Sequence, residues 1–178
     1  MKKTDQIIID SVINWFEKSV LGLNLCPFAA RPYSEGSISF ELSHANDDES
    51  CLVDVSLMLN RLEQHAKIET LVLIIPEHLH LFDDYNQFLN LADELLYQQG
   101  WQGVIQIASF HPDYVFANCD IDDRSNWTNR SPYPLLHFIR ESSISKAVQH
   151  YPDVDNIPRR NIELLRSLSD EEMKQIFD

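Results

Sequence analysis

The stretch TLVLII, residues 70–75, is the part of the sequence that decides the fold. After its threonine it is apolar without interruption, and Pro76 follows it directly. A short apolar run without alternation is typical of a strand that is buried on both faces of a sheet. We therefore expect these residues to form the central strand of a layered sheet.

Helical and strand patterns alternate along the chain on either side of this run. Apolar residues recur at helical spacing in residues 5–21, 46–66 and 83–100, whereas residues 36–42 and 103–110 have the composition and length of strands. Alternation of this kind implies βαβ units with parallel pairing and predicts the α/β class. A ferredoxin-like arrangement, in which part of the sheet is antiparallel, is the alternative.

The C-terminal part of the chain is expected to be a helical extension. We interpret residues 135–151, which follow Pro134, as one helix, and a second helix begins near Pro158. A capping box, Ser169 to Glu172, predicts a last short helix. With 178 residues, the length fits a single α/β domain over residues 1–178.

Composition excludes several classes of function. The formal net charge is −14, which disfavours nucleic acid and anionic membranes as partners. The four glycines are not clustered, so the sequence lacks the phosphate loops that bind ATP, GTP or NAD, and we expect no cofactor. Three cysteines without a metal or disulfide pattern, and no signal peptide or long apolar run, predict a cytoplasmic protein.

Chemically capable residues are densest between Phe110 and Arg140. This stretch begins at the end of an expected strand and contains a long polar crossing, and such crossings are usually functional or partly structured. Residues 114–117 within this crossing could form a further short strand. Since ligands bind at the carboxyl ends of parallel strands, His111, held by Pro112, is the first candidate for a catalytic acid or base.

Basic residues are distributed unevenly. No Lys or Arg occurs in residues 68–123, whereas seven occur in residues 124–166, and most of these are arginines, which bind phosphate or carboxylate in a bidentate manner. We therefore expect a pocket for a small anionic molecule, although the arginines could instead pair with the protein's own acids. The expected substrate-binding residues are Arg130, Arg140, Arg159, Arg160, Asn129 and Tyr114.

Cys26 and His137 are further catalytic candidates. A helix that starts at Pro27 would place Cys26 at its N-cap, where the helix dipole stabilises a thiolate nucleophile or redox thiol. The alternative is a buried, inert cysteine. In the helix expected after Pro134, His137 lies one turn before Glu141. The carboxylate would raise the pKa of the histidine, as a general base requires. The alternative is a surface pair of structural value only.

Several segments resemble one bacterial family, called domain of unknown function 1415. They are GLNLCPFA (22–29), QIASFHPDYVFA (106–117), the Asp122–Asp123 pair, TNRSPYPLLHFIRE (128–141) and IPRRNIELLR (157–166). The resemblance covers nearly the whole chain. It implies a complete, soluble bacterial protein of about this size, but it supplies no activity.

The residues are compatible with three hypotheses on function. The leading one is a small-molecule enzyme that acts on a phosphate- or carboxylate-bearing substrate. The second is a non-catalytic binding or assembly protein that docks a partner through residues 111–134, with Trp127, Tyr133 and the arginines as anchors. The third is a metal-binding module in which His44, His78 and His111 converge at the strand ends. The sequence leaves the oligomeric state open.

Overall fold

Strand β2 (Thr70–Ile74) lies inside a four-stranded sheet of order β1-β2-β4-β3, in a computed structural model that describes residues 3–149 and 151–177. All residues of β2 are buried. Leu71 and Leu73 belong to the core on one face of the sheet, whereas Val72 and Ile74 belong to the core on the other. The prediction of a central strand that is buried on both faces is confirmed.

The sheet combines parallel and antiparallel pairing. Strand β1 (Ile38–Leu42) pairs parallel to β2, and helix α3 (Asp48–Gln64) connects the two, as expected for a βαβ unit. Strand β4 (Leu135–Arg140) is inserted between β2 and β3 (Ile105–Phe110) and is antiparallel to both. The α/β class is confirmed, and the sheet is mixed because of this one strand.

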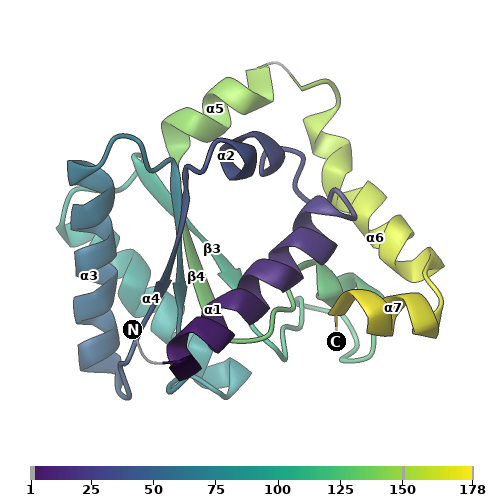
Figure 1. The fold of residues 1–178 in the computed structure, drawn as a ribbon, viewed down its shortest axis with the longest axis horizontal. Helices are drawn as coiled ribbons and strands as arrows, with labels where there is room; N and C mark the ends of the chain where they lie inside the picture. Colours follow the sequence, from purple (N-terminus) through teal and green to yellow (C-terminus); the bar gives the residue numbers. More distant parts are fainter. Residues whose placement is uncertain (1–2, 150, 178) are drawn as a thin grey trace.

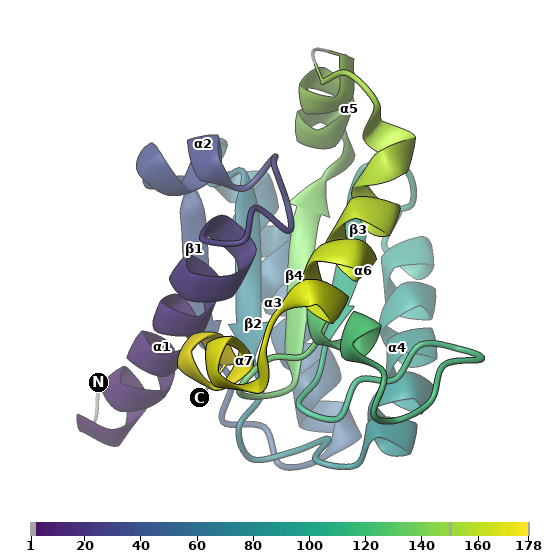
Figure 2. The same ribbon diagram turned by 90° about the vertical axis from the view of Figure 1, so that its right-hand side faces the viewer.

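Helices cover both faces of the sheet (Figures 1 and 2). Helices α3 and α4 (Phe82–Gln98) pack on one face. On the other face lies α1 (Lys3–Trp15), which continues as the π-helical turn η1 (Phe16–Leu21). The remaining helices lie on the side of α1 or above the sheet: α2 (Ala30–Ser34), α5 (Glu141–Gln149), α6 (Ile157–Ser167) and α7 (Asp170–Phe177).

The single helix expected over residues 135–151 is wrong. Residues 135–140 form β4, and helix α5 starts only at Glu141. The strand alternates, because Leu136 and Phe138 enter the core under α3 and α4 while Leu135 packs on the opposite face. The backbone of this segment is hydrogen-bonded to β2 on one side and to β3 on the other. This pairing depends on distant segments, so the local sequence does not reveal it.

The crossing at residues 111–134 contains a short 3₁₀ helix, η2 (Arg124–Thr128), but no strand at residues 114–117. The buried Asn126 organises it: its Oδ1 accepts from the Phe116 N–H at 3.0 Å, and its Nδ2 donates to the Asp120 carbonyl at 2.9 Å. Helix α6 packs against η2, and Arg166 pairs with Asp123 at 2.6 Å. The crossing is therefore an ordered part of the fold.

None of the helices within residues 3–149 and 151–177 has the length and apolar character that crossing a membrane requires. The expected C-terminal helices are confirmed for α6 and α7. At the start of α7, the Ser169 N–H donates to Glu172 Oε2 at 2.7 Å and the Glu172 N–H donates to Ser169 Oγ at 3.2 Å, as the capping box predicts.

Candidate functional site

Arg140, the last residue of β4, lies at the edge of the sheet where β1, β2 and β3 begin, because β4 runs in the opposite direction. Its Nε donates to the Ile68 carbonyl at 3.0 Å, and its Nη2 donates to the Leu62 carbonyl near the end of α3. These bonds fix the guanidinium at the negative end of a helix dipole. Among the described residues, Arg140 has no carboxylate partner, so an acidic side chain does not neutralise its charge.

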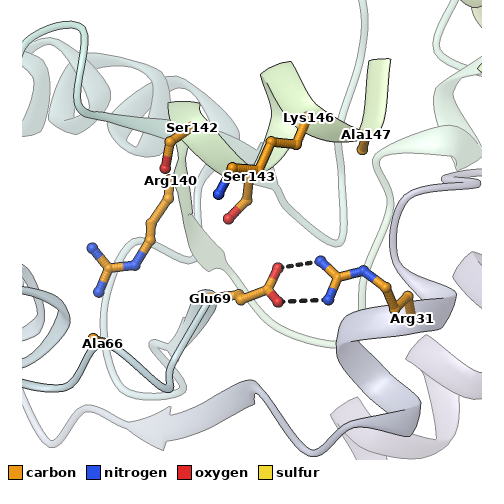
Figure 3. A pocket seen from close by; sticks show the side chains of 8 residues that line it. All are labelled: Arg31, Ala66, Glu69, Arg140, Ser142, Ser143, Lys146 and Ala147. Atoms are coloured by element: carbon orange, nitrogen blue, oxygen red, sulfur yellow. Dashed lines mark hydrogen bonds and ion pairs between the residues drawn. The ribbon is translucent and has the colours of Figure 1, made fainter. Parts of the chain in front are cut away.

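A cleft of about 690 Å³ opens beside Arg140 (Figure 3). It lies between α2, the segment before β2 and the start of α5. Three cationic side chains and one carboxylate line it, in a chain whose net charge is −14. The lining residues are Arg31, Ala66, Glu69, Arg140, Ser142, Ser143, Lys146 and Ala147.

The one carboxylate in the cleft is held by an arginine. Arg31 Nη1 and Nη2 lie 2.8 and 2.7 Å from the two carboxylate oxygens of Glu69, and Nη1 also lies 2.6 Å from Glu35. These acids raise the pKa of Arg31, with the hydrogen bond to Glu69 as the largest cause. Figure 3 shows this pair on one side of the cleft and Arg140 on the other, with Lys146 reaching between them from α5.

The first turn of α5 also faces the cleft through Ser142 and Ser143. The N–H groups of a first helical turn have no partner within the helix, and the helix dipole is positive there. Hydroxyl groups at this position add donors that can turn toward a ligand. The dipole, Arg140 and Lys146 therefore act in the same direction, which favours a negatively charged group, whereas Arg31 is already paired with Glu69 and Glu35.

A smaller, more apolar hollow of about 210 Å³ continues from the cleft and shares Arg31, Glu69, Ser143 and Ala147 with it. Phe28 and Tyr151 contribute an edge-to-face aromatic pair to its wall, with ring centroids 5.4 Å apart. A molecule with an anionic group and an apolar part thus has complementary surfaces for both.

Of the four arginines expected to bind an anion, only Arg140 lines this cleft. Arg130 donates to the Tyr114 carbonyl at 3.2 Å and to the Ile121 carbonyl at 2.7 Å, and burial lowers its pKa. Arg160 donates to Asn161 Oδ1 at 3.0 Å and also to the Asn24 carbonyl. These two arginines hold backbone segments together instead of facing a common pocket.

The other expected binding residues also have partners within the fold. Arg159 forms a surface pair with Glu163 at 3.8 Å on α6. Asn129 Nδ2 donates to the Ser109 carbonyl at 2.9 Å, and the Tyr114 ring packs on Phe82 with centroids 5.1 Å apart. Trp127, the expected anchor for a partner protein, packs on Phe177 of α7.

His111 is fully buried between the rings of Phe82 and Tyr85. Its Nε2 donates to the Leu79 carbonyl at 3.0 Å, and its Nδ1 accepts from the Asp113 N–H at 3.0 Å. Both nitrogens are thus used, the neutral tautomer is fixed, and burial lowers the pKa of the ring. A general base needs a nitrogen within reach of the substrate, so this geometry gives His111 a structural role.

Cys26 and His137 do come together, because both line a small apolar cavity under η1. Their expected settings are wrong, however. No helix starts at Pro27, since α2 starts at Ala30, and His137 lies in β4, so it has no helical pairing with Glu141. Burial raises the pKa of the Cys26 thiol, and burial lowers the pKa of His137 to about 4. The His137 Nε2 is hydrogen-bonded to Thr70 Oγ1.

The histidines at the carboxyl ends of the strands do not form a metal centre. His44 lies 3.8 Å from Asp5, and His78 lies 2.7 Å from Asp48. Within the part of the chain that the structure describes, no group of three or more His, Cys, Asp or Glu side chains could hold a metal ion.

Sequence reasoning missed Arg31 and Glu69, which lie 38 residues apart in the chain. Nothing in their local sequence marks them, since they meet only through the packing of α2 beside the start of β2. Lys146 did carry a signal, because it belongs to the base-rich segment of residues 124–166.

Fold and site together define a layered α/β protein with a mixed sheet and a basic cleft at one sheet edge. The model of the family described as "Protein of unknown function (DUF1415)" matches residues 7–175, and the chain belongs to this family. Every residue that lines the cleft lies within the matched range. Neither a curated protein nor a solved structure matches the chain.

Proposed function

We propose that this protein binds a small phosphate- or carboxylate-bearing molecule in the basic cleft. The observation that carries the proposal is that Lys146 and Arg140, which has no carboxylate partner among the described residues, line one hollow in a chain of net charge −14. A local positive field inside an overall negative molecule attracts small anions while the rest of the surface repels large polyanions.

Arg140 is the centre of the proposed site. Its bonds to the Ile68 and Leu62 carbonyls order the side chain before any ligand arrives, which lowers the entropy cost of binding. Lys146 supplies a flexible point charge, and the first turn of α5 supplies hydrogen-bond donors.

The proposal is for binding and includes no reaction. Cys26, His111 and His137, the three residues expected to be catalytic, are absent from the residues that line the cleft. Glu69 lines it, but Arg31 engages both of its carboxylate oxygens.

Isothermal titration at low ionic strength with inorganic phosphate, pyrophosphate, acetate and citrate tests the proposal. We expect saturable binding of at least one anion, and Lys146→Ala should weaken it about tenfold, the typical effect of losing one charge-assisted contact. The matched control is Lys174→Ala, an exposed lysine on α7, which should leave the affinity unchanged.

Either of two results would contradict the proposal. One is the lack of saturable binding of any of the four anions. The other is an equal loss of affinity in Lys146→Ala and Lys174→Ala, because that would identify the binding as general attraction to surface charge.

A further inference from the structure

The apolar hollow of about 210 Å³ lies between α2 and α5, and both of these helices lie above the sheet (Figure 1). It shares four lining residues with the basic cleft, so the two form one continuous depression. The residues that only the hollow contributes are mostly apolar, and they include Pro27, Phe28, Pro32, Ile139, Ile144 and Tyr151. An anion bound in the cleft therefore has an apolar wall beside it.

The apolar side chains of the hollow lie outside the core. Phe28, Ile139, Ile144 and Tyr151 are half-buried, and the three hydrophobic clusters of the described residues do not include them. Side chains of these types usually contribute to a core, because their burial stabilises the fold. Here they line an open depression, and a concave apolar surface bordered by a few polar groups is typical of a ligand-binding site.

The aromatic wall of the hollow is held in place from outside. Arg160 Nη1 lies 3.4 Å from the Tyr151 hydroxyl, and Arg160 Nη2 donates to the Asn24 carbonyl. Arg160 thus links the segment after α5 to the segment before α2, and the rings of Phe28 and Tyr151 meet edge to face between them. A wall that is ordered before a ligand arrives lowers the entropy cost of binding.

Arg31 lies where the cleft meets the hollow, since it lines both. Its N–H groups engage the two carboxylate oxygens of Glu69 at 2.8 and 2.7 Å. These contacts use the edge of the planar guanidinium, whereas arginine stacks on aromatic rings through its faces. The pair also offsets the charge of Glu69, which is the one carboxylate that lines the depression, so an anion meets little repulsion there.

The volume and the rings of the hollow favour one aromatic ring. An apolar cavity of about 150 Å³ engineered into another protein binds benzene, so a hollow of about 210 Å³ accommodates a six-membered ring. Edge-to-face and offset contacts between aromatic rings stabilise a complex more than the buried apolar area alone. An aromatic ring therefore has an advantage over a saturated ring of the same size.

We infer that the ligand of the cleft is an aromatic anion, in which one ring fills the hollow and a phosphate or carboxylate group attached to the ring reaches Arg140 and Lys146. This inference rests on the proposed function, because the ring and the anionic group belong to one molecule. The ring contacts Phe28, Ile144 and a face of Arg31. The cleft selects the charge of the ligand, and the hollow selects its ring.

Isothermal titration at pH 8 tests the inference with two pairs of ligands, phenyl phosphate with inorganic phosphate and phenylacetate with acetate. Within each pair the charge is the same and the ring is added. We expect the aromatic member of at least one pair to bind about tenfold more tightly, the lower end of the effect of burying a phenyl side chain. The cyclohexyl analogue of that ligand should bind about threefold more weakly than the aromatic one.

Phe28→Ala should reduce the affinity ratio within that pair to about twofold or less, because the ring loses its aromatic wall. Lys146→Ala should weaken both members of the pair and leave their ratio unchanged. The matched control is Tyr97→Ala, which removes an exposed aromatic side chain on α4 and should change neither affinity.

Nuclear Overhauser effects in the wild-type protein test the position of the ring without a substitution. We expect them between the ring protons of the bound ligand and the methyl groups of Ile139 and Ile144. Their absence at saturating ligand overturns the inference, even if Phe28→Ala does not fold.

Three further results overturn the inference. Equal affinities within both pairs, with binding that still depends on Lys146, would leave the proposed function intact and remove the ring. Equal affinities of the aromatic ligand and its cyclohexyl analogue would mean that any apolar group serves. Methyl shifts of Ile144 that change on dilution of the ligand-free protein would show that a second copy of the chain covers the hollow. No binding of any of these anions overturns the proposed function as well.

Discussion

The two edges of the sheet each carry a hollow of similar size but of opposite charge. At the edge where β1, β2 and β3 end, a hollow of about 610 Å³ is lined by Asp47, Asp48, Glu49 and Asp84, with His78 as its one basic group. At the edge where β4 ends, the basic cleft has about 690 Å³. Basic side chains line only the hollow at the second edge, which is not the edge where ligands of parallel α/β sheets usually bind.

Helix dipoles explain this polarity. Helices α3 and α4 both follow parallel strands, so their first turns, rich in Asp and Glu, lie at the edge where those strands end. The carbonyl end of α3 points to the opposite edge, where it binds Arg140. One antiparallel strand, β4, thus brings the base-rich segment to the edge where the end of the α3 dipole favours cations.

The largest effect on stability should come from His111, which lies at the edge opposite to the proposed binding cleft. His111→Ala leaves the Leu79 carbonyl and the Asp113 N–H without partners and opens a space between Phe82 and Tyr85. We expect the free energy of unfolding to fall by about 3 kcal/mol, measured by urea denaturation. Anion affinity at the cleft should not change in the folded fraction, and a selective loss of affinity would restore His111 as a site residue.

Acidification should have the next largest effect, through His137 in β4. Its folded-state pKa, about 4, lies below the ordinary value of 6.5, so the unfolded chain binds a proton more readily between these values. The contribution of neutral His137 is complete above pH 6.5 and is lost as the pH falls to about 4, by about 2 kcal/mol since the residue is half-buried.

Urea denaturation at pH 7, 5.5 and 4.5 measures this loss of stability. His137→Gln, which keeps a polar side chain near Thr70 Oγ1 but does not titrate, should flatten the profile. Part of the slope should remain, because burial lowers the pKa of His111 as well. An identical profile in wild type and variant would contradict the assignment.

The hydroxyl of Tyr85 links the end of β3 to the start of β4. Its hydroxyl donates to the Leu135 carbonyl at 2.7 Å and accepts from the Phe110 N–H at 3.0 Å. Tyr85→Phe should lower the free energy of unfolding by about 1.5 kcal/mol, measured by thermal or urea denaturation. Tyr97→Phe, on the exposed side of the same helix, is the control and should have no effect.

The smallest effect on stability should come from the edge with the basic cleft. Lys146→Ala is expected to change the free energy of unfolding by less than about 0.5 kcal/mol, because the side chain is exposed on α5. Urea denaturation of this variant, in parallel with the anion titrations, shows whether a loss of anion affinity occurs without a loss of stability. A loss of several kcal/mol would mean that this edge, too, is structural.

The prediction of the site fails where it depends on β4. Residues 135–140 satisfy a strand pattern through Leu136 and Phe138, but the helical continuation from Glu141 favours one long helix in the sequence. That single error places His137 beside Glu141 and moves Arg140 away from the sheet edge. The crossing at residues 111–134 is ordered, and Arg130, Asn129 and Tyr114 form contacts within it instead of facing a ligand.

The sequence by itself determined the central strand at residues 70–74, the α/β class and the caps of individual helices, as at Ser169 and Glu172. These features depend on spacing over a few residues, which the chain carries locally. Only the tertiary structure decided the direction of β4, the meeting of Arg31 with Glu69 and the charge of each sheet edge. Strand direction and side-chain convergence depend on pairing between distant segments, and that information is spread over the whole core.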